Sequence, residues 1–461
     1  MELVVQNPWW KNKSEIEKDI HVSRWLNSRV KWIPSLKDEI EWIDAVYTVR
    51  GPRQVGKTTL LKLWIRDLLS TTSSERVFYW SCDLVKDEQA LYSVVSEYLG
   101  WARKLSDDRL YVFLDEVSNV RDWQKAVKLL WDTGMLVKVT IILTGSHSLD
   151  IRASSERLPG RRGDAKKDPD KVLLPLSFSD YVRMVDSTLW NNCRSRDKGE
   201  LFVRDLNHHL RTYMLTGGFP KAIDEYLKEK KIGYSVYRMY LDVVLGDLEK
   251  WGRKIGTLKE IIKVVIDGLT TPLGWSTIKG KTSVDSHNTV LSYIDALSES
   301  YTLFYIYQLD EKLLPMHRKN KKIYFTDPLL FHCLNSWSLS AEGFDEALDY
   351  LSKTDNESRL VENIVAINLF EYYKGNEGFG FWGDKKEIDF VTHEKTWIEV
   401  KWKEKIKDSE VAGLKGMDGK KIVLTKNEYR DKDGVSLIPV SLFLARGGVS
   451  TFEKEATLKT K

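Results

Sequence analysis

The sequence predicts an α/β protein whose first part is a mostly parallel sheet, followed by a helical region and a C-terminal α/β region. Two observations lead to this fold class. Short apolar strands alternate with helical stretches over residues 45–143, and a glycine-containing loop joins the first strand directly to the first helix. Strands that alternate with helices form a parallel sheet covered by helices on both faces.

The composition is that of an ordinary folded protein. The chain has 461 residues, a formal net charge of +4, 30% charged residues and 42% hydrophobic residues. These values exclude a disordered chain, a collagen-like chain and a strongly basic nucleic-acid coat. The three cysteines are far apart and form no CxxC pair, which indicates neither a disulfide framework nor a structural zinc site. We therefore expect a cytoplasmic protein.

Two further patterns bear on a membrane location. No apolar run approaches the roughly 18 residues of a membrane-spanning helix. The first ten residues also lack the basic start and apolar core of a signal peptide. We expect no membrane partner.

Hydrophobic periodicity gives the order of the elements. The predicted strands of the first part are 45–49, 77–80, 110–114 and 139–143, and the helices are 60–68, 87–99 and 121–133. A loop is expected over 151–172, helices over 200–250, and a small helical unit over 258–309 that ends in a strand. At about 150 residues per domain the length allows roughly three domains, which we place at 1–200, 201–340 and 341–461.

The loop after the first strand fits the pattern GxxxxGK[ST] in every position, and this pattern predicts an ATP site with Mg²⁺. Glycines let backbone N–H groups approach phosphates closely, and the following helix directs its positive end toward them. Lys57 would neutralise phosphate charge and Thr58 would bind Mg²⁺. The expected nucleotide-binding residues are Gly51, Pro52, Arg53, Gln54, Val55, Gly56, Lys57, Thr58 and Thr59.

Two carboxylates end the buried strand 110–114. Ligands bind at the C-terminal edge of open α/β sheets, so Asp115 is expected to bind Mg²⁺ and Glu116 to act as general base for an attacking water. Strand 139–143 also has a polar end, where Thr144 or Ser146 would sense the γ-phosphate. An ordinary capping turn is the alternative for these two residues.

Four arginines follow within a short polar stretch. An arginine supplied in cis or by a neighbouring subunit can stabilise transferring phosphoryl charge. Arg161 is the first candidate and Arg162 the second, and action from a neighbour would require a homo-oligomer. A solvated basic loop is the alternative.

Several segments together resemble a family of prokaryotic, largely archaeal, AAA-type ATP-binding proteins. The resemblance rests on Asn7-Pro8-Trp9-Trp10, the loop 51–59, Phe113-Leu114-Asp115-Glu116, Thr144-Gly145-Ser146, Leu158-Pro159-Gly160-Arg161 and Pro175-Leu176-Ser177-Phe178. It implies an AAA-type sheet in which the strand with the catalytic glutamate lies between the phosphate-loop strand and its neighbour. It also implies a C-terminal domain similar to restriction endonucleases.

The middle region has the pattern of a winged helix. A serine N-cap, Ser286, precedes a helix whose apolar residues share one face, and a helix and a basic turn come before it. In a winged helix His287, Asn288 and Thr289 would face a DNA groove. A similar module used only for packing or partner contact is the alternative, because this helix has no dense Lys/Arg stripe.

The C-terminal region contains an Asp…Glu-x-Lys pattern on a predicted hairpin. A turn centred on Glu394 would place Asp389 opposite Glu399, and these two could hold a divalent metal with Lys401 beside them. Glu362 could add a fourth group and Glu387 is an alternative ligand. The same residues also occur on ordinary charged surface hairpins.

Together these patterns predict a Mg²⁺-dependent ATPase that couples ATP binding and hydrolysis to DNA binding or processing, with metal-dependent nuclease activity as a further hypothesis. The alternative is a slow ATP-controlled switch that acts on a protein partner and keeps an inactive nuclease-like scaffold. A DNA-binding module without catalysis is disfavoured by the Asp115-Glu116 pair.

Overall fold

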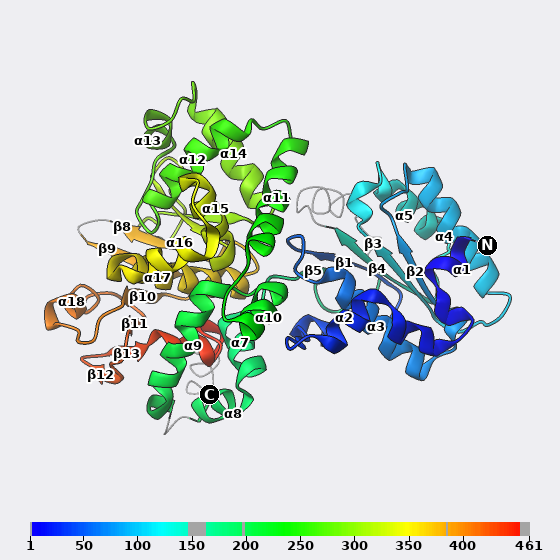
Figure 1. Ribbon diagram of the computed structural model, residues 1–461, viewed down its shortest axis with the longest axis horizontal. Helices are drawn as coiled ribbons and strands as arrows, with labels where there is room; N and C mark the ends of the chain where they lie inside the picture. The colour runs from blue at the N-terminus through cyan, green and yellow to red at the C-terminus, as the bar shows by residue number, and fades with distance from the viewer. Residues whose placement is uncertain (1, 146–162, 196–198, 384–385, 452–461) are drawn as a thin grey trace. The chain divides into compact units, whose positions relative to one another are not determined.

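The computed structural model describes residues 2–145, 163–195, 199–383 and 386–451. Contacts divide the chain into two compact units, Met1–Leu174 and Pro175–Lys461 (Figure 1). The contacts set the boundary between the two units at residues 174 and 175, and the three-domain division at 200 and 340 stays a prediction. Within the described ranges, no helix is long and apolar enough to cross a membrane.

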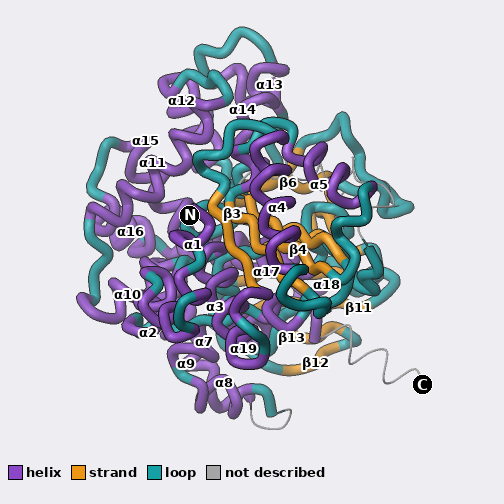
Figure 2. Tube along the Cα trace, turned by 90° about the vertical axis from the view of Figure 1, so that its right-hand side faces the viewer, coloured by secondary structure: helices purple, strands orange, loops and turns teal. Residues whose placement is uncertain are grey.

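The first unit contains a five-stranded parallel sheet of order β2-β3-β4-β1-β5. Strands β3 and β4 run side by side (Figure 2). Every residue of these two strands is buried, and their mostly apolar sequences are typical of strands that are covered on both faces. The strands are β1 (Ala45–Arg50), β2 (Val77–Ser81), β3 (Leu110–Asp115), β4 (Val139–Gly145) and β5 (Asp170–Val172). The helices are α1 (Glu2–Gln6), α2 (Ile20–Asn27), α3 (Lys57–Thr71), α4 (Glu88–Ala102) and α5 (Trp123–Asp132).

Two expectations about this sheet are wrong. Strand β3, which precedes Glu116, does not lie beside the phosphate-loop strand β1, because β4 is inserted between them. The expected loop 151–172 ends in strand β5, which pairs in parallel with β1. This strand has three residues at the sheet edge, two of them charged, and so lacks the apolar run that marks the inner strands.

The N-terminal segment covers the free edge of strand β2. The Asn7 side chain donates to the Tyr79 carbonyl at 3.0 Å and accepts from the Tyr79 N–H at 2.7 Å. The indole N–H groups of Trp9 and Trp10 both donate to the Val77 carbonyl at 3.0 Å. Side chains thus satisfy backbone groups that an edge strand would otherwise expose.

The second unit starts with helices and continues with the element order of a winged helix. Three helices, α12, α13 and α14, are followed by the antiparallel strands β6 and β7. The elements are α7 (Phe178–Val185), α8 (Ser187–Cys193), α9 (Val203–Thr216), α10 (Pro220–Glu229), α11 (Tyr234–Lys250), α12 (Ile255–Asp267), α13 (Trp275–Gly280), α14 (His287–Glu299), β6 (Leu303–Tyr307) and β7 (Lys321–Phe325).

The C-terminal region forms a six-stranded mixed sheet of order β12-β13-β11-β10-β9-β8. Its strands are β8 (Phe379–Gly383), β9 (Glu387–Thr392), β10 (Thr396–Lys401), β11 (Lys420–Thr425), β12 (Arg430–Lys432) and β13 (Val435–Pro439). The helices are α15 (Pro328–Leu339), α16 (Gly343–Ser352), α17 (Thr354–Tyr372), α18 (Asp408–Ala412) and α19 (Val440–Ala445).

Helix α19 ties the end of the second unit to its beginning. The Ser179 hydroxyl of α7 donates to the Ala445 carbonyl at 2.8 Å. The Ser441 hydroxyl donates to the side-chain oxygen of Asn207 on α9 at 2.6 Å. These contacts explain why residues 175–200 belong to the second unit.

Candidate functional site

The loop between β1 and α3 has the backbone that a phosphate-binding loop needs. Gly51 and Gly56 have φ angles of +152° and +110°, which side chains other than glycine rarely allow. A Cβ atom on Gly51 would lie 2.0 Å from the Leu173 carbonyl oxygen, so no side chain fits there. Both glycines of the motif are thus required by conformation or by space.

Lys57 is the first residue of α3, and its ammonium group is held inside the loop. Its Nζ donates to the carbonyl oxygens of Gly51 and Pro52, both at 3.0 Å, and lies 3.7 Å from Glu116 Oε1. The side chain is buried. The lysine is thus positioned between the loop that would bind phosphate and the carboxylate expected to activate water.

Asp115, at the end of β3, is surrounded by hydroxyl groups. Thr58 Oγ1 donates to Asp115 Oδ2 at 2.7 Å, and the Tyr79 hydroxyl donates to the same oxygen at 3.0 Å. Thr144 Oγ1, at the end of β4, donates to Oδ1. All three partners are neutral, and they fix a buried carboxylate at the C-terminal edge of the sheet.

Glu116 adopts an unusual backbone conformation. Its φ angle is +52°, and its N–H donates to Thr144 Oγ1 at 2.9 Å. A non-glycine residue in this region costs about 1–3 kcal/mol, and such residues are concentrated at functional sites. The turn leaves the Glu116 side chain a quarter exposed and directs it toward Lys57.

The oxygen groups at this edge fit a Mg²⁺ ion. Mg²⁺ prefers carboxylate and hydroxyl oxygens together with phosphate oxygens, and Thr58 and Asp115 bring two such groups within hydrogen-bond distance. The other candidates of this region, Ser146, Arg161 and Arg162, lie outside the described residues.

Two residues of this site were not found from the sequence. Tyr79 contacts Asp115, and Lys62 Nζ lies 3.3 Å from the centroid of the Tyr79 ring and 3.2 Å from Asp19 Oδ2. Burial and the nearby Asp115 carboxylate raise the pKa of Tyr79 far above its usual value, so the phenol remains a hydrogen-bond donor. No motif marks either residue, since their role depends on β2 lying beside β3.

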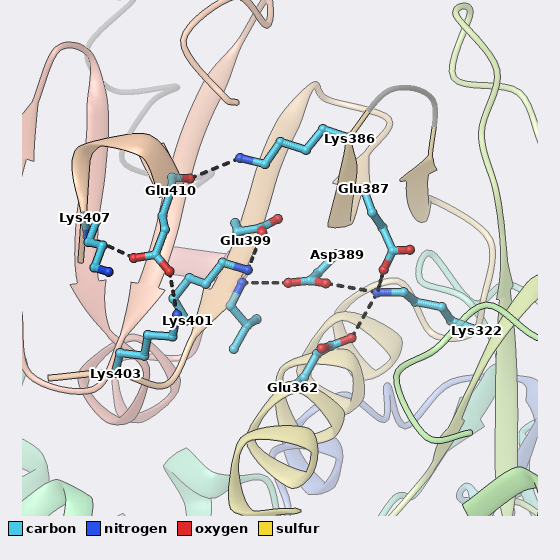
Figure 3. A network of polar contacts seen from close by, with 11 residues as sticks. Lys322, Glu362, Lys386, Glu387, Asp389, Glu399, Lys401, Lys403, Lys407 and Glu410 are labelled. Atoms are coloured by element: carbon cyan, nitrogen blue, oxygen red, sulfur yellow. Dashed lines mark hydrogen bonds and ion pairs between the residues drawn. The ribbon is translucent and has the colours of Figure 1, made fainter. Parts of the chain in front are cut away.

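A second cluster of charges lies in the second unit, around the buried ammonium of Lys322 on β7 (Figure 3). Its Nζ is 2.9 Å from Glu387 Oε1, 3.0 Å from Asp389 Oδ1 and 3.2 Å from Glu362 Oε1. The Tyr324 hydroxyl donates to the same Glu362 oxygen at 2.8 Å. Sequence reasoning missed Lys322, although two lysines that begin an otherwise apolar strand were a visible sign.

The C-terminal hairpin has the expected register. Trp397 pairs with Val391 and Ile398 with Phe390, which sets Asp389 opposite Glu399. Asp389 Oδ2 accepts from the Val400 N–H at 2.9 Å. On the neighbouring strand Glu399 Oε1 pairs with Lys401 Nζ at 2.6 Å, while Glu399 Oε2 is buried and has no hydrogen-bond partner among the described residues.

These carboxylates do not fit a divalent metal in the arrangement observed. Both oxygens of Asp389 are already engaged, one by Lys322 and the other by a backbone N–H. Across the described ranges, no group of three or more His, Cys, Asp or Glu residues is arranged to hold a metal ion. Burial would lower the pKa of Lys322, but Tyr324 and the carboxylates around it raise that pKa well above its usual value. The ammonium therefore stays charged.

The winged-helix segment presents polar and basic groups on its surface. Ser286 caps α14 by accepting from the Thr289 N–H at 3.1 Å, and His287 and Asn288 of its first turn are exposed. The loop between β6 and β7 is also exposed and basic. The exposed cations of the loop and of the α13 region are Lys279, Lys281, Lys312, Arg318 and Lys319.

Family comparisons divide the chain into three matched segments. Residues 44–182 match the family described as AAA domain. This segment contains the loop, β1 and the Asp115 site on one parallel sheet. The first unit has a P-loop NTPase fold of the AAA type. Residues 207–341 and 357–443 match two families, DUF8612 and DUF4143, each described as a domain of unknown function.

Relatives extend along most of the chain but are themselves uncharacterised. The chain is 23% identical to the uncharacterised protein MJ1637 of Methanocaldococcus jannaschii, over 94% of this chain and 89% of that one. It is 25% identical to an uncharacterised protein of Haemophilus influenzae, over 86% of this chain and 93% of the relative.

The solved structures that align with the chain are less similar to it in sequence. A Walker-type ATPase of Pyrococcus abyssi aligns with a TM-score of 0.40 and 16% identity, over 65% of this chain and 93% of that one. The ORC1 protein of Aeropyrum pernix in complex with DNA aligns with a TM-score of 0.31 and 12% identity, over 72% and 96% of the two chains.

Proposed function

We propose that the chain is a Mg²⁺-dependent ATPase whose second unit binds DNA. The observation that carries the ATPase proposal is the Asp115 centre, in which the Thr58 hydroxyl and the Asp115 carboxylate meet at 2.7 Å beside the Lys57–Glu116 pair. A protein that only binds nucleotide has no need for a strained glutamate 3.7 Å from the lysine of the loop.

Each residue has a distinct task in this proposal. The Lys57 ammonium exchanges its contacts with loop carbonyls for phosphate oxygens and stabilises the charge that develops on the transferred phosphoryl group. Glu116 orients a water and accepts its proton. Thr58 and Asp115 would hold Mg²⁺, which when bound neutralises phosphate charge. The Thr144 hydroxyl donates to Asp115 and accepts from the Glu116 N–H, and it thereby fixes the position of Asp115 relative to the Glu116 backbone.

Steady-state ATP hydrolysis by the purified full chain tests this assignment. Lys57→Ala should abolish Mg²⁺-dependent hydrolysis, because it removes the buried ammonium that the loop carbonyls hold, whereas Lys128→Ala, at an exposed position on α5, should hydrolyse normally. Normal turnover by Lys57→Ala would contradict the site. Omission of Mg²⁺ should remove activity from the wild-type chain as well.

The proposal that DNA is the target is supported by the winged-helix order of α12 to β7 and by the exposed cations around it. Phosphate contacts make affinity fall with salt, by roughly one unit of log–log slope for each contact. The affinity for duplex DNA should therefore fall steeply as the salt concentration is raised from about 50 to 200 mM. The double variant Arg318→Ala/Lys319→Ala should lower the slope by about 2.

A matched control is Lys403→Ala, because this lysine already pairs with Glu410 at 2.6 Å. It should leave DNA affinity and the salt slope unchanged. Hydrolysis should be measured with and without single-stranded, duplex and branched DNA. Stimulation of hydrolysis by one form of DNA would indicate that ATP hydrolysis is coupled to nucleic acid. If the double variant binds DNA as the wild type does, the winged-helix segment is not the DNA-binding surface.

The second candidate function is an ATP-controlled switch that acts on a protein partner. The observation that favours it is the lysine among the C-terminal carboxylates. Carboxylates that are paired with a lysine favour a structural role for this domain over metal-dependent cleavage. Hydrolysis that is indifferent to every form of DNA would favour this candidate. If a neighbouring copy of the chain supplies Arg161 to the site, the rate of hydrolysis per chain should rise with protein concentration.

A further inference from the structure

The Lys322 cluster joins two segments that match different families. Lys322 and Tyr324 lie on β7, within residues 207–341, while Glu362, Glu387 and Asp389 lie on α17 and β9, within residues 357–443. The cation at the centre of the C-terminal carboxylates is thus supplied from outside the C-terminal segment, as Figure 3 shows.

We propose that the Lys322 ammonium is the resident cation of this centre, in the position that a divalent metal would need, so that the wild-type chain binds no metal there and does not cleave DNA through it. This proposal does not rest on the ATPase assignment. It concerns the second unit alone.

The contacts of Lys322 use the oxygens that a metal would require. Its Nζ lies 2.9–3.2 Å from one oxygen each of Glu362, Glu387 and Asp389. A Mg²⁺ ion needs such oxygens at about 2.0–2.1 Å and would lie within a few ångströms of the ammonium. Two cations that close in a buried site repel each other strongly, so one excludes the other.

The Asp389–Glu399 pair is engaged by further contacts. Asp389 Oδ2 accepts from the Val400 N–H, and Glu399 Oε1 pairs with Lys401. Glu399 Oε2 is the one carboxylate oxygen of the Asp389–Glu399 pair without a hydrogen-bond partner among the described residues. This one oxygen would leave a divalent ion, whose six ligands include waters, without the Asp389 carboxylate that the Asp…Glu-x-Lys pattern would supply.

The Asn363 side chain of α17 holds the backbone of strand β7 by two hydrogen bonds. The Phe325 N–H donates to Asn363 Oδ1 at 2.8 Å, and Asn363 Nδ2 donates back to the Phe325 carbonyl at 2.9 Å. Asn363 directly follows Glu362 on the helix. The main chain that carries Lys322 is therefore held to the helix that carries one of its carboxylates, and the Lys322 side chain itself is fully buried.

The neighbouring Lys321 supplies a matched control. It is adjacent on the same strand and also buried, but its Nζ donates to the carbonyl oxygens of His317 and Lys319 at 2.5 and 2.8 Å. Among the described residues, the Lys321 ammonium forms no ion pair with a carboxylate of the cluster. Removal of Lys321 takes away a buried ammonium without opening the carboxylates.

The test is Mn²⁺ binding to the full chain without nucleotide, followed by electron paramagnetic resonance. Lys322→Ala should bind one Mn²⁺ at least tenfold more tightly than the wild-type chain, and Mn²⁺ should raise its melting temperature. The added Asp389→Asn substitution should abolish both responses. Lys321→Ala should behave as the wild type does. A folded Lys322→Ala chain that gains no Mn²⁺ site would overturn the proposal.

A second comparison keeps the proposal testable if Lys322→Ala does not fold. Wild-type and Asp389→Asn chains should bind Mn²⁺ equally and should both leave supercoiled and linear DNA intact in Mn²⁺ or Mg²⁺. Metal binding or DNA cleavage by the wild-type chain that disappears in Asp389→Asn would overturn the proposal.

Discussion

Each of the two units buries an aspartate on a strand of its sheet, Asp115 on β3 and Asp389 on β9, but the groups around the two carboxylates differ. Asp115 accepts hydrogen bonds from Thr58, Tyr79 and Thr144, all neutral hydroxyl groups. Asp389 faces the ammonium of Lys322 and a backbone N–H. The partners of a carboxylate, rather than its presence, decide whether it can hold a metal ion. Hydroxyl groups can turn to share an ion, whereas an ammonium excludes it.

The largest effect expected from this comparison concerns the first centre. Glu116→Gln keeps the shape of the side chain but removes its ability to accept a proton. ATP hydrolysis should fall by about 10²–10⁴-fold, while ATP binding, measured by calorimetry, should persist. The exposed Glu97→Gln on α4 is the matched control and should be fully active. A Glu116→Gln chain with ordinary turnover would place the general base elsewhere.

The next effect concerns the stability of the second centre. Lys322→Ala leaves three carboxylates without their shared cation, and breaking a buried ion pair costs about 3–5 kcal/mol. Urea unfolding at neutral pH should show a loss of this size. Lys403→Ala breaks a pair whose lysine is 60% exposed and should cost less than about 1 kcal/mol. Equal losses in the two variants would mean that the cluster contributes no more than a surface pair.

A third effect is a pH dependence of the stability of the second unit. His332 on α15 is buried, its Nε2 contacts the Met214 carbonyl at 2.9 Å, and burial lowers its pKa from 6.5 to about 4. The folded state therefore binds fewer protons than the unfolded state below pH 6.5. Its contribution to stability is complete above pH 6.5 and is lost as the pH falls toward 4, by about 3 kcal/mol.

Urea titrations of the wild type and His332→Gln at pH 7 and pH 4.5 measure this contribution. Glutamine keeps a neutral donor for the Met214 carbonyl but does not titrate. The variant should lose less stability than the wild type on acidification. The same acid sensitivity in both chains would assign the loss to other groups.

The smallest effect sharpens the role of the hydroxyl groups around Asp115. Tyr79→Phe removes one neutral hydrogen bond, which is worth about 1 kcal/mol. We expect about a fivefold loss in kcat/KM for ATP, greatest at low Mg²⁺. Tyr98→Phe is the control, because its hydroxyl donates to the Glu75 carbonyl at 3.0 Å, away from the carboxylate. A loss that saturating Mg²⁺ does not reduce would argue against a role in positioning Asp115.

The sequence was informative where the chemistry is local. The loop 51–58 and the Asp115-Glu116 pair follow strands directly, so their positions could be predicted from the chain order. The hairpin register was also predictable, because a turn centred on Glu394 determines which residues face each other.

Features that depend on distant contacts were not predictable. The insertion of β4 between β1 and β3 is a matter of topology, and the contact of Tyr79 with Asp115 depends on which strands are neighbours. Lys322 is 67 residues from Asp389 in the chain, and no spacing rule connects a lysine on one strand with carboxylates that far away. The pattern Asp…Glu-x-Lys was therefore found while the cation that fills its centre was not.

The closure of the second unit by helix α19 has a consequence for its synthesis. Asn207 on α9 bonds to Ser441, 234 residues further along the chain. At about 5–20 residues per second, a ribosome needs roughly 10–50 s to make that stretch. During this time α7 and α9 lack their contacts with α19. The strands of the first unit, in contrast, are all made by residue 172. The first unit can thus fold while the second is still being made, and the second unit becomes complete only once residues 440–445 of α19 have been made.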